Sequence, residues 1–293
     1  MNRLAIAFVI ASTLLSVSGC SWQQARSDEA AEHSHGSHAH GDHSGDGHAH
    51  DSHAHHGAGP TTTQAKLTTP PDINPNEAVD LVFDIQDLDG QPVPEFEIFQ
   101  EQLMHLIVVS DDLRFYDHIH PEYKGDGRFE IQKSFPQSGG YTLISDYKPA
   151  GQSEQVSLTK ATILGPKPSA PAPEFSRVKT FDRTQVELIL DQSVVKAKED
   201  VTISFKLQDI ASGEPVADLE PYLGELGHMV IVKQSDSLTK ADYIHAHALR
   251  GTPADQVDFA TQFPEPGKYK AWGQFQRDGK IITADFWIDV VDE

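Results

Sequence analysis

The sequence predicts an all-β protein with two tandem immunoglobulin-like β-sandwich modules behind a disordered, histidine-rich N-terminal tail. Three observations lead to this prediction: short segments alternate apolar and polar residues, turn motifs separate them, and the second half repeats the first. The segments "AVDLVFDIQD" (78–87) and "VTISFKL" (201–207) each place four apolar side chains on one face, which is typical of half-buried strands. Motifs such as "LDGQPV", "SGEPV" and "RDGK" mark turns at the spacing of a sandwich.

The repeat sets the module boundaries. "VFDIQDLDGQPV" matches "SFKLQDIASGEPV", and "FPQSGGYTLISDYKPAG" aligns without gaps to "FPEPGKYKAWGQFQRDG", which pairs Tyr141 with Tyr269. A Pro-rich stretch, "GPKPSAPAPEF" (165–175), has no period and is typical of a semi-rigid linker. We therefore expect module one at 62–164 and module two at 176–293.

The N-terminus has the layout of an export signal. "MNRLAIAFVIASTLLSVSGC" begins with a basic residue, continues with an apolar core and ends with small residues, so residues 1–19 are predicted to be a signal peptide. The ending "VSGC" resembles a bacterial lipoprotein signal, which implies cleavage before Cys20 and acylation of that residue. We expect an exported protein anchored to the bacterial envelope, at the outer membrane facing the periplasm or at the cell surface.

Residues 20–61 are predicted to be disordered, because they lack apolar periodicity. They hold ten of the sixteen histidines among Gly, Ser, Ala and Asp, a composition that presents many imidazoles to a divalent metal. The alternative is a spacer that happens to be rich in histidine. The candidate ligands of this tail are His33, His35, His38, His40, His43, His48, His50, His53, His55 and His56.

The charge of the chain excludes one class of partner. With 23 Lys and Arg against 44 Asp and Glu, the formal net charge is -21, whereas nucleic-acid binding requires basic patches. An acidic surface attracts cations and also keeps a protein soluble.

The six remaining histidines recur at corresponding places in the two modules. Each module has one histidine at the start of an apolar run, in "MHLIVV" or "GHMVIV", and a His-x-His pair further on, in "DHIHP" or "YIHAH". Residues two apart on a strand point to one face, so a His-x-His pair and a histidine from a neighbouring strand can share one metal ion. The predicted ligands are His105, His118 and His120 in module one and His228, His245 and His247 in module two.

A further ligand is expected from the strand "YTLISDY". In an immunoglobulin-like sandwich this strand lies beside "HLIVV", which brings Asp146 toward the histidines of module one. The aligned residue of module two is Gln274, a poorer ligand. We therefore expect Asp146 to coordinate the metal and module one to be the tighter site; the alternative is a solvated carboxylate at a strand end.

These motifs resemble a family of secreted bacterial proteins with cupredoxin-like or immunoglobulin-like modules that are described as heavy-metal-binding. The resemblance rests on "MHLIVVSDDLRFYDHIHP", "YLGELGHMVIV" and "YIHAH", and it covers roughly residues 75–292. It implies an exported β-sandwich protein linked to metal, commonly copper. One departure is that Ala248 stands where module one has Pro121.

The ligand types narrow the choice of metal. The single cysteine is expected to carry the lipid anchor, which excludes a blue-copper site, and imidazole ligation suits Cu(II) or Zn(II). Copper is the first choice by affinity order, and zinc is the second because the tail resembles the histidine-rich loops of zinc-handling proteins.

Three functions remain open from the sequence. The leading one is a metal-binding lipoprotein that captures, buffers or delivers copper or zinc, with a metal transporter or efflux system as a possible partner. The alternatives are a copper-dependent redox enzyme of superoxide-dismutase-like build, and adhesive modules whose histidines are incidental.

Overall fold

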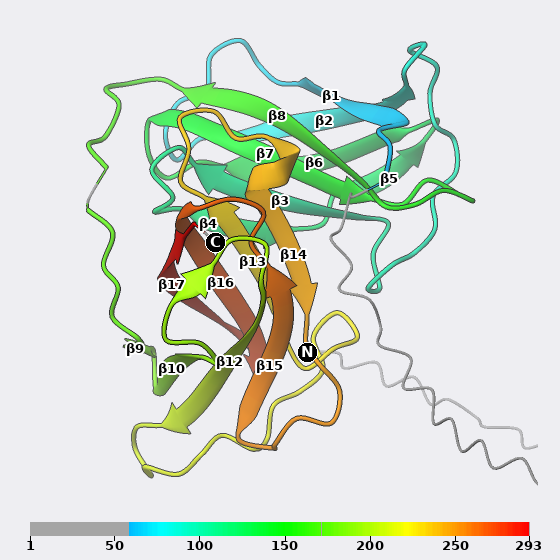
Figure 1. Cartoon of the computed structure of the whole chain (residues 1–293). Coiled ribbons are helices and arrows are strands. Elements are labelled where there is room, and N and C mark those ends of the chain that lie inside the picture. Colours follow the sequence, from blue (N-terminus) through cyan, green and yellow to red (C-terminus); the bar gives the residue numbers. More distant parts are fainter. Residues whose placement is uncertain (1–58, 171, 293) are drawn as a thin grey trace, which may run out of the picture. The chain divides into compact units, whose positions relative to one another are not determined.

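The computed structural model describes residues 59–170 and 172–292, and strands make up most of this part of the chain (Figure 1). The predicted fold class is confirmed, because the strands form four sheets that are grouped as two consecutive β-sandwiches. The predicted signal peptide, Cys20 and the ten tail histidines lie outside the described residues. Strands stop at Ile163 and resume at Val178, so none falls within the described residues of the predicted linker.

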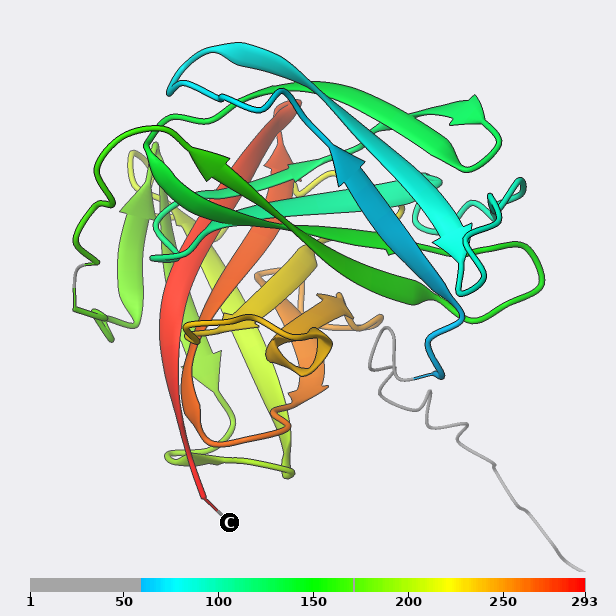
Figure 2. The same cartoon turned by 90° about the horizontal axis from the view of Figure 1, so that it is seen from above.

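Module one consists of two four-stranded sheets, with the strand orders β1-β2-β6-β5 and β4-β3-β7-β8 (Figures 1 and 2). The alternating burial along β2 shows why this segment forms a strand with one face in the core. The strands are β1 (Thr63–Thr68), β2 (Ala78–Asp87), β3 (Met104–Ser110), β4 (Tyr116–Ile119), β5 (Glu122–Gly125), β6 (Arg128–Ser134), β7 (Gly139–Tyr147) and β8 (Gln155–Ile163).

Module two repeats this arrangement, with the strand orders β15-β12-β10-β9 and β11-β17-β16-β13-β14. Strands β13, β14 and β16 correspond to β3, β4 and β7 of module one. The elements are β9 (Val178–Phe181), β10 (Thr184–Leu190), β11 (Val195–Lys196), β12 (Asp200–Asp209), β13 (His228–Lys233), the 3₁₀ helix η1 (Lys240–Asp242), β14 (Tyr243–His247), β15 (Gln256–Gln262), β16 (Gly267–Arg277) and β17 (Lys280–Val291).

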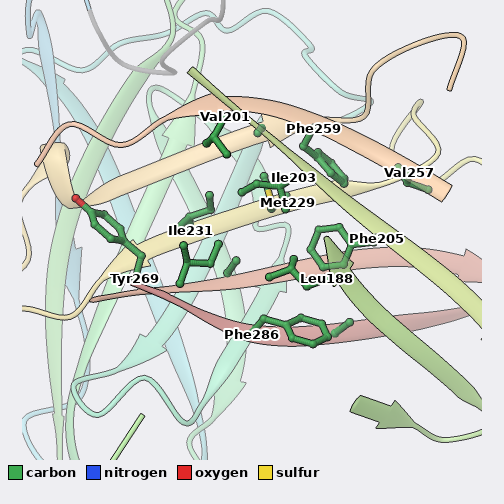
Figure 3. Close-up of a cluster of buried hydrophobic side chains, with 14 of the residues drawn as sticks. Leu188, Val201, Ile203, Phe205, Met229, Ile231, Val257, Phe259, Tyr269 and Phe286 are labelled. Atoms are coloured by element: carbon green, nitrogen blue, oxygen red, sulfur yellow. The ribbon is translucent and has the colours of Figure 1, made fainter. Parts of the chain in front are cut away.

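Each sandwich has its own apolar core. In module two, Phe205 of β12 and Phe259 of β15 lie with Ile231 of β13 and Phe286 of β17, so both sheets contribute to one cluster (Figure 3). All four side chains are fully buried. Burying an aromatic or branched side chain stabilises the fold by about 1.5–3 kcal/mol, which makes these residues the main support of the sheets.

A third apolar cluster joins the modules, which belong to one compact unit. All seven residues of β3 are buried, because alternate side chains enter the core of module one and the others pack against module two. In β13 of module two, alternate side chains likewise enter the core of module two, and the others pack against module one. The buried members of this interface are Ile107, Val109, Leu113, Ile144, Val156, Val230, Val232, Tyr243, Trp272 and Trp287.

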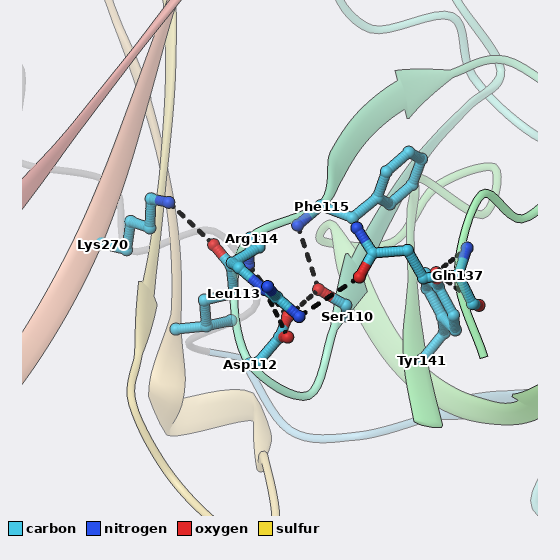
Figure 4. Close-up of polar contacts among 8 residues, drawn as sticks. All are labelled: Ser110, Asp112, Leu113, Arg114, Phe115, Gln137, Tyr141 and Lys270. Atoms are coloured by element: carbon cyan, nitrogen blue, oxygen red, sulfur yellow. Dashed lines mark hydrogen bonds and ion pairs between the residues drawn. The ribbon is translucent and has the colours of Figure 1, made fainter. Parts of the chain in front are cut away.

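A polar contact supports the interface at the loop between β3 and β4. The ammonium group of Lys270 on β16 donates a hydrogen bond of 2.8 Å to the carbonyl oxygen of Leu113 (Figure 4). The loop is held in shape by Ser110, whose hydroxyl donates to Asp112 and accepts from the backbone N–H of Phe115. This loop leads into β4, which carries part of the candidate site.

Candidate metal centre

The three histidines predicted in module one lie together. His105 is on β3, His118 is on the adjacent strand β4, and His120 follows the end of that strand. Nδ1 of His105 lies 3.0 Å from Nε2 of His118 and 3.3 Å from Nε2 of His120. One ligand nitrogen from each residue lies within 4.8 Å of the other two, which is a convergent arrangement. We call these residues triad one.

The three histidines predicted in module two lie together in the same way. His228 begins β13, and His245 and His247 lie on the paired strand β14, with His228 directly opposite His247. Their ligand nitrogens also lie within 4.8 Å of one another, and their ring centroids are 5.0–5.8 Å apart. We call these residues triad two.

Backbone carbonyls orient the histidine of each triad that lies outside the His-x-His pair, His105 or His228, which we call the lone histidine. Nε2 of His105 donates to the carbonyl oxygen of Phe99 at 3.2 Å, and Nε2 of His228 donates to that of Tyr222 at 2.8 Å. Metal-bound histidines in proteins almost always use their second ring nitrogen in this way. In each neutral ring the proton is then on Nε2, which leaves Nδ1 as the basic nitrogen.

The two carbonyls belong to the same kind of turn. Phe99–Gln102 and Tyr222–Glu225 are tight turns closed by reciprocal backbone hydrogen bonds, and their central residues have φ between 49° and 82°. Three of these four central residues are not glycine; the exception is Gly224. Left-handed backbone at non-glycine residues is costly and persists where its surroundings demand it, here beside each triad.

The first histidine of each His-x-His pair, His118 or His245, donates a hydrogen bond to a residue of the opposite module; we call these two the middle histidines. Nδ1 of His118 donates to Oε1 of Gln274 in module two at 2.8 Å, and Nδ1 of His245 donates to Oδ2 of Asp146 in module one at 3.1 Å. The acceptor positions are equivalent in the two sheets, so the exchange is reciprocal. In both rings Nε2 is then the basic nitrogen.

The position of Asp146 differs from the sequence-based expectation. Strands β3 and β7 do pair, with His105 opposite Asp146, but the carboxylate accepts a hydrogen bond from His245 of triad two. Asp146 is fully buried, so it is not a solvated residue at a strand end. The hydrogen bond places the carboxylate beside triad two, and coordination of a metal ion by Asp146 in module one stays a prediction.

Two tyrosines that the sequence analysis did not single out complete this network. The hydroxyl of Tyr116 donates to Gln274 at 3.1 Å, and that of Tyr243 donates to Asp146 at 3.3 Å. Burial raises the pKa of both phenols well above the usual value, so they stay protonated and act as donors. The signal was present as Tyr-x-His-x-His in "YDHIH" and "YIHAH", because residues at i, i+2 and i+4 share a face.

Burial controls the protonation of the triads. His105, His228 and His245 are at most 1% exposed and His118 is 7% exposed. Burial, reinforced by the neighbouring imidazoles, holds the pKa of His118 well below its usual range, and burial together with His228 lowers the pKa of His120 to about 4. The neutral imidazole that results is the form that binds a metal ion.

Solved structures with a likeness to the chain include bacterial surface proteins. FdeC, an adhesin of Escherichia coli, is 14% identical with a TM-score of 0.26, and the match covers 79% of this chain and 65% of that one. Invasin, a bacterial integrin-binding protein, is 12% identical with a TM-score of 0.26 over 80% and 40% of the two chains. Escherichia coli alpha-2-macroglobulin is 15% identical with a TM-score of 0.25, over 80% of this chain and 16% of that one. The chain thus spans less than two thirds of each of these proteins, and likenesses this weak carry no conclusion about function.

Comparison with curated proteins gives no match. A family model described as a domain of unknown function (DUF8832) matches residues 60–162 and 179–292, which include both triads. Within the described part of the chain, no helix is long and apolar enough to cross a membrane.

Proposed function

Because the chain belongs to the family described as a domain of unknown function (DUF8832), we propose its function from the site: it binds copper, or zinc, and captures, buffers or delivers the metal. Each module contributes one three-histidine site. The lipid anchor at Cys20 and the histidine-rich tail belong to the same proposal, which places the protein at the bacterial envelope and gives it additional, weaker metal sites.

The observation that carries this proposal is the convergence of basic nitrogens in triad one. His105 and His118 each donate their ring N–H outward, so their lone pairs face each other across 3.0 Å. Two lone pairs at this distance repel unless a proton or a metal ion lies between them. Since burial lowers the pKa of His118, the protonated form is disfavoured and a metal ion is the better occupant.

The distances fit coordination by one ion. Two nitrogens bound at 2.0–2.1 Å to the same metal are about 2.9 Å apart at a right angle and about 3.3 Å apart at the tetrahedral angle. The separations of His105 Nδ1 from His118 Nε2 and His120 Nε2 are 3.0 Å and 3.3 Å. Imidazole ligands suit Cu(II) and Zn(II), and the affinity order favours copper.

Calorimetric titration with Cu(II) and Zn(II) tests the proposal. The protein used is the full chain with its ten tail histidines replaced by glutamine and Cys20 by serine, because a thiolate is itself a copper ligand. We call it the tail-substituted chain. It is expected to bind two ions, and the unsubstituted chain is expected to bind several more with lower affinity, since a disordered tail loses chain entropy on each binding event.

Two variants assign the ions to the triads. His120→Ala and His247→Ala remove half-buried ligands at corresponding positions, so the fold is least disturbed. Each is expected to weaken one of the two sites by more than about tenfold and to leave the other able to bind an ion. A tail-substituted chain that binds no metal above background would exclude the proposed function.

A further inference from the structure

We infer that the two triads form a single dinuclear centre at the interface between the modules, holding two divalent cations close enough to interact. This inference rests on the proposed function, and it concerns how the two sites are related. It differs from two independent sites, one per module, because each triad would depend on residues of the other module.

The first observation is the distance between the triads. The ring centroid of His245 in module two lies 5.8 Å from that of His105 and 6.1 Å from that of His118, both in module one. Within triad one the centroids are 5.0–5.2 Å apart, so the separation between triads is scarcely larger than that within them. The six rings form one continuous cluster.

These distances limit the separation of the ions. An ion bound at 2.0–2.1 Å from a ring nitrogen lies about 3.2 Å from the ring centroid. With 5.8 Å between the centroids of His105 and His245, two bound ions can be no more than about 12 Å apart. The ligand nitrogens nevertheless group as two sets of three, which provides a place for two ions.

The second observation is that each triad is completed by the opposite module. Nδ1 of His118 donates a hydrogen bond to Gln274, and Nδ1 of His245 donates one to Asp146, in both cases across the interface. The phenols of Tyr116 and Tyr243 cross the interface to the same two acceptors. A tyrosine and a histidine of each module thus contact the equivalent acceptor of the other module, as at a two-fold interface. Neither triad is therefore fully oriented until the modules have docked.

The third observation is the charge at the cluster. Asp146 is a fully buried carboxylate, and its hydrogen bond with His245 places negative charge beside triad two. Triad one has the neutral amide of Gln274 at the equivalent position. The first ion is therefore expected to bind at triad two, where the carboxylate compensates part of its charge, and the second at triad one.

Electron paramagnetic resonance of the tail-substituted chain tests the inference without altering the site. One equivalent of Cu(II) is expected to give the spectrum of an isolated ion. Two equivalents are expected to give a spectrum broadened or diminished by coupling between the two spins, with a half-field transition. The His247→Ala variant, in which triad two is impaired, should keep the isolated spectrum when one equivalent has bound.

The outcomes separate this inference from the proposed function. Two bound equivalents that give the sum of two isolated spectra, with full intensity and no half-field transition, would overturn the dinuclear centre and leave the metal-binding function intact. Saturation at one ion per chain would also overturn it. The absence of any bound copper would instead remove the proposed function itself.

Discussion

The difference between Asp146 and Gln274 is the main chemical asymmetry of the site. Both residues occupy the position opposite the lone histidine of their own module, and both accept a hydrogen bond from the middle histidine of the other module. A carboxylate acceptor raises the basicity of the histidine that donates to it more than an amide does. Triad two is therefore expected to bind metal more tightly than triad one.

Asp146→Asn is expected to lower the metal affinity of triad two by about 10- to 100-fold, because the acceptor of His245 loses its charge. The measurement is a Cu(II) titration of the tail-substituted chain carrying His120→Ala, so that triad two is the intact site. If Asp146 were a direct ligand of triad one, the loss would appear instead in the chain carrying His247→Ala.

The matched change is Gln274→Glu, which places a carboxylate beside His118. In the chain carrying His247→Ala this variant is expected to raise the affinity of triad one for Cu(II) by about tenfold. Thermal melting without metal serves as the control, because an additional buried carboxylate also lowers stability. If the variant is folded and its affinity for Cu(II) is unchanged, the residue that accepts the hydrogen bond from His118 does not control metal binding.

At the scale of elements, strands β3 and β13 each serve two surfaces. Their alternate side chains enter the core of their own sandwich, while the others form the interface and present His105 and His228 to the cluster. A strand that is buried on both faces has a nearly continuous apolar run, as Leu106–Val109 forms in β3. The strands that form the interface thus also position His105 and His228.

Trp272→Ala tests the interface at this scale. The indole of Trp272 on β16 stacks on the ring of Tyr116 in module one, with the centroids 4.8 Å apart and an angle of 14° between the planes. Removing a buried Trp side chain is expected to lower the free energy of unfolding by about 3–5 kcal/mol. Hydrogen exchange of the backbone amides of β3 and β7 should also become faster, although the substitution lies in the other module.

Phe286→Ala is the control, because Phe286 lies in the core of module two rather than at the interface. It is expected to accelerate exchange in module two more than in β3 and β7. Exchange in β3 and β7 that does not respond to Trp272→Ala would show that the two modules are not coupled through this interface.

The sequence predicted the two sandwiches and the membership of both triads, because these depend on local patterns. Period-two alternation identifies strands, and His-x-His on a strand places two imidazoles on one face. The packing of module two against Ile107 and Val109 of β3 was not predictable, since an apolar face does not identify what covers it. For the same reason the hydrogen bond from His245 to Asp146 was missed, because it exists only after the modules dock.

At the scale of the whole molecule, the interface between the modules contains both apolar packing and a cluster of histidines, in which the pKa values of His118 and His120 are lowered. The apolar residues favour docking at any pH, whereas the histidines favour it only while they remain uncharged. Protonation would place positive charges between two packed surfaces with little water to solvate them. The docking of the modules is therefore expected to depend on pH even without metal.

The metal-free protein is expected to lose stability as the pH falls from about 6.5 to about 4. In the unfolded chain His118 and His120 bind protons near pH 6.5, whereas in the folded chain the pKa of His118 is well below that value and the pKa of His120 is about 4. Between these values the unfolded state binds more protons, so the free energy of unfolding is highest above pH 6.5 and decreases with acidification. Bound metal also requires neutral imidazole, and in the folded chain His120 is still largely neutral at pH 5, because its pKa is about 4. The rise in melting temperature produced by Cu(II) or Zn(II) should therefore persist at pH 5 and diminish as the pH falls through about 4. Thermal melting of the tail-substituted chain at pH 7.5, pH 5 and pH 4, with chelator or with metal, measures both effects. A metal-induced rise at pH 4 as large as that at pH 7.5 would mean that histidines are not the ligands.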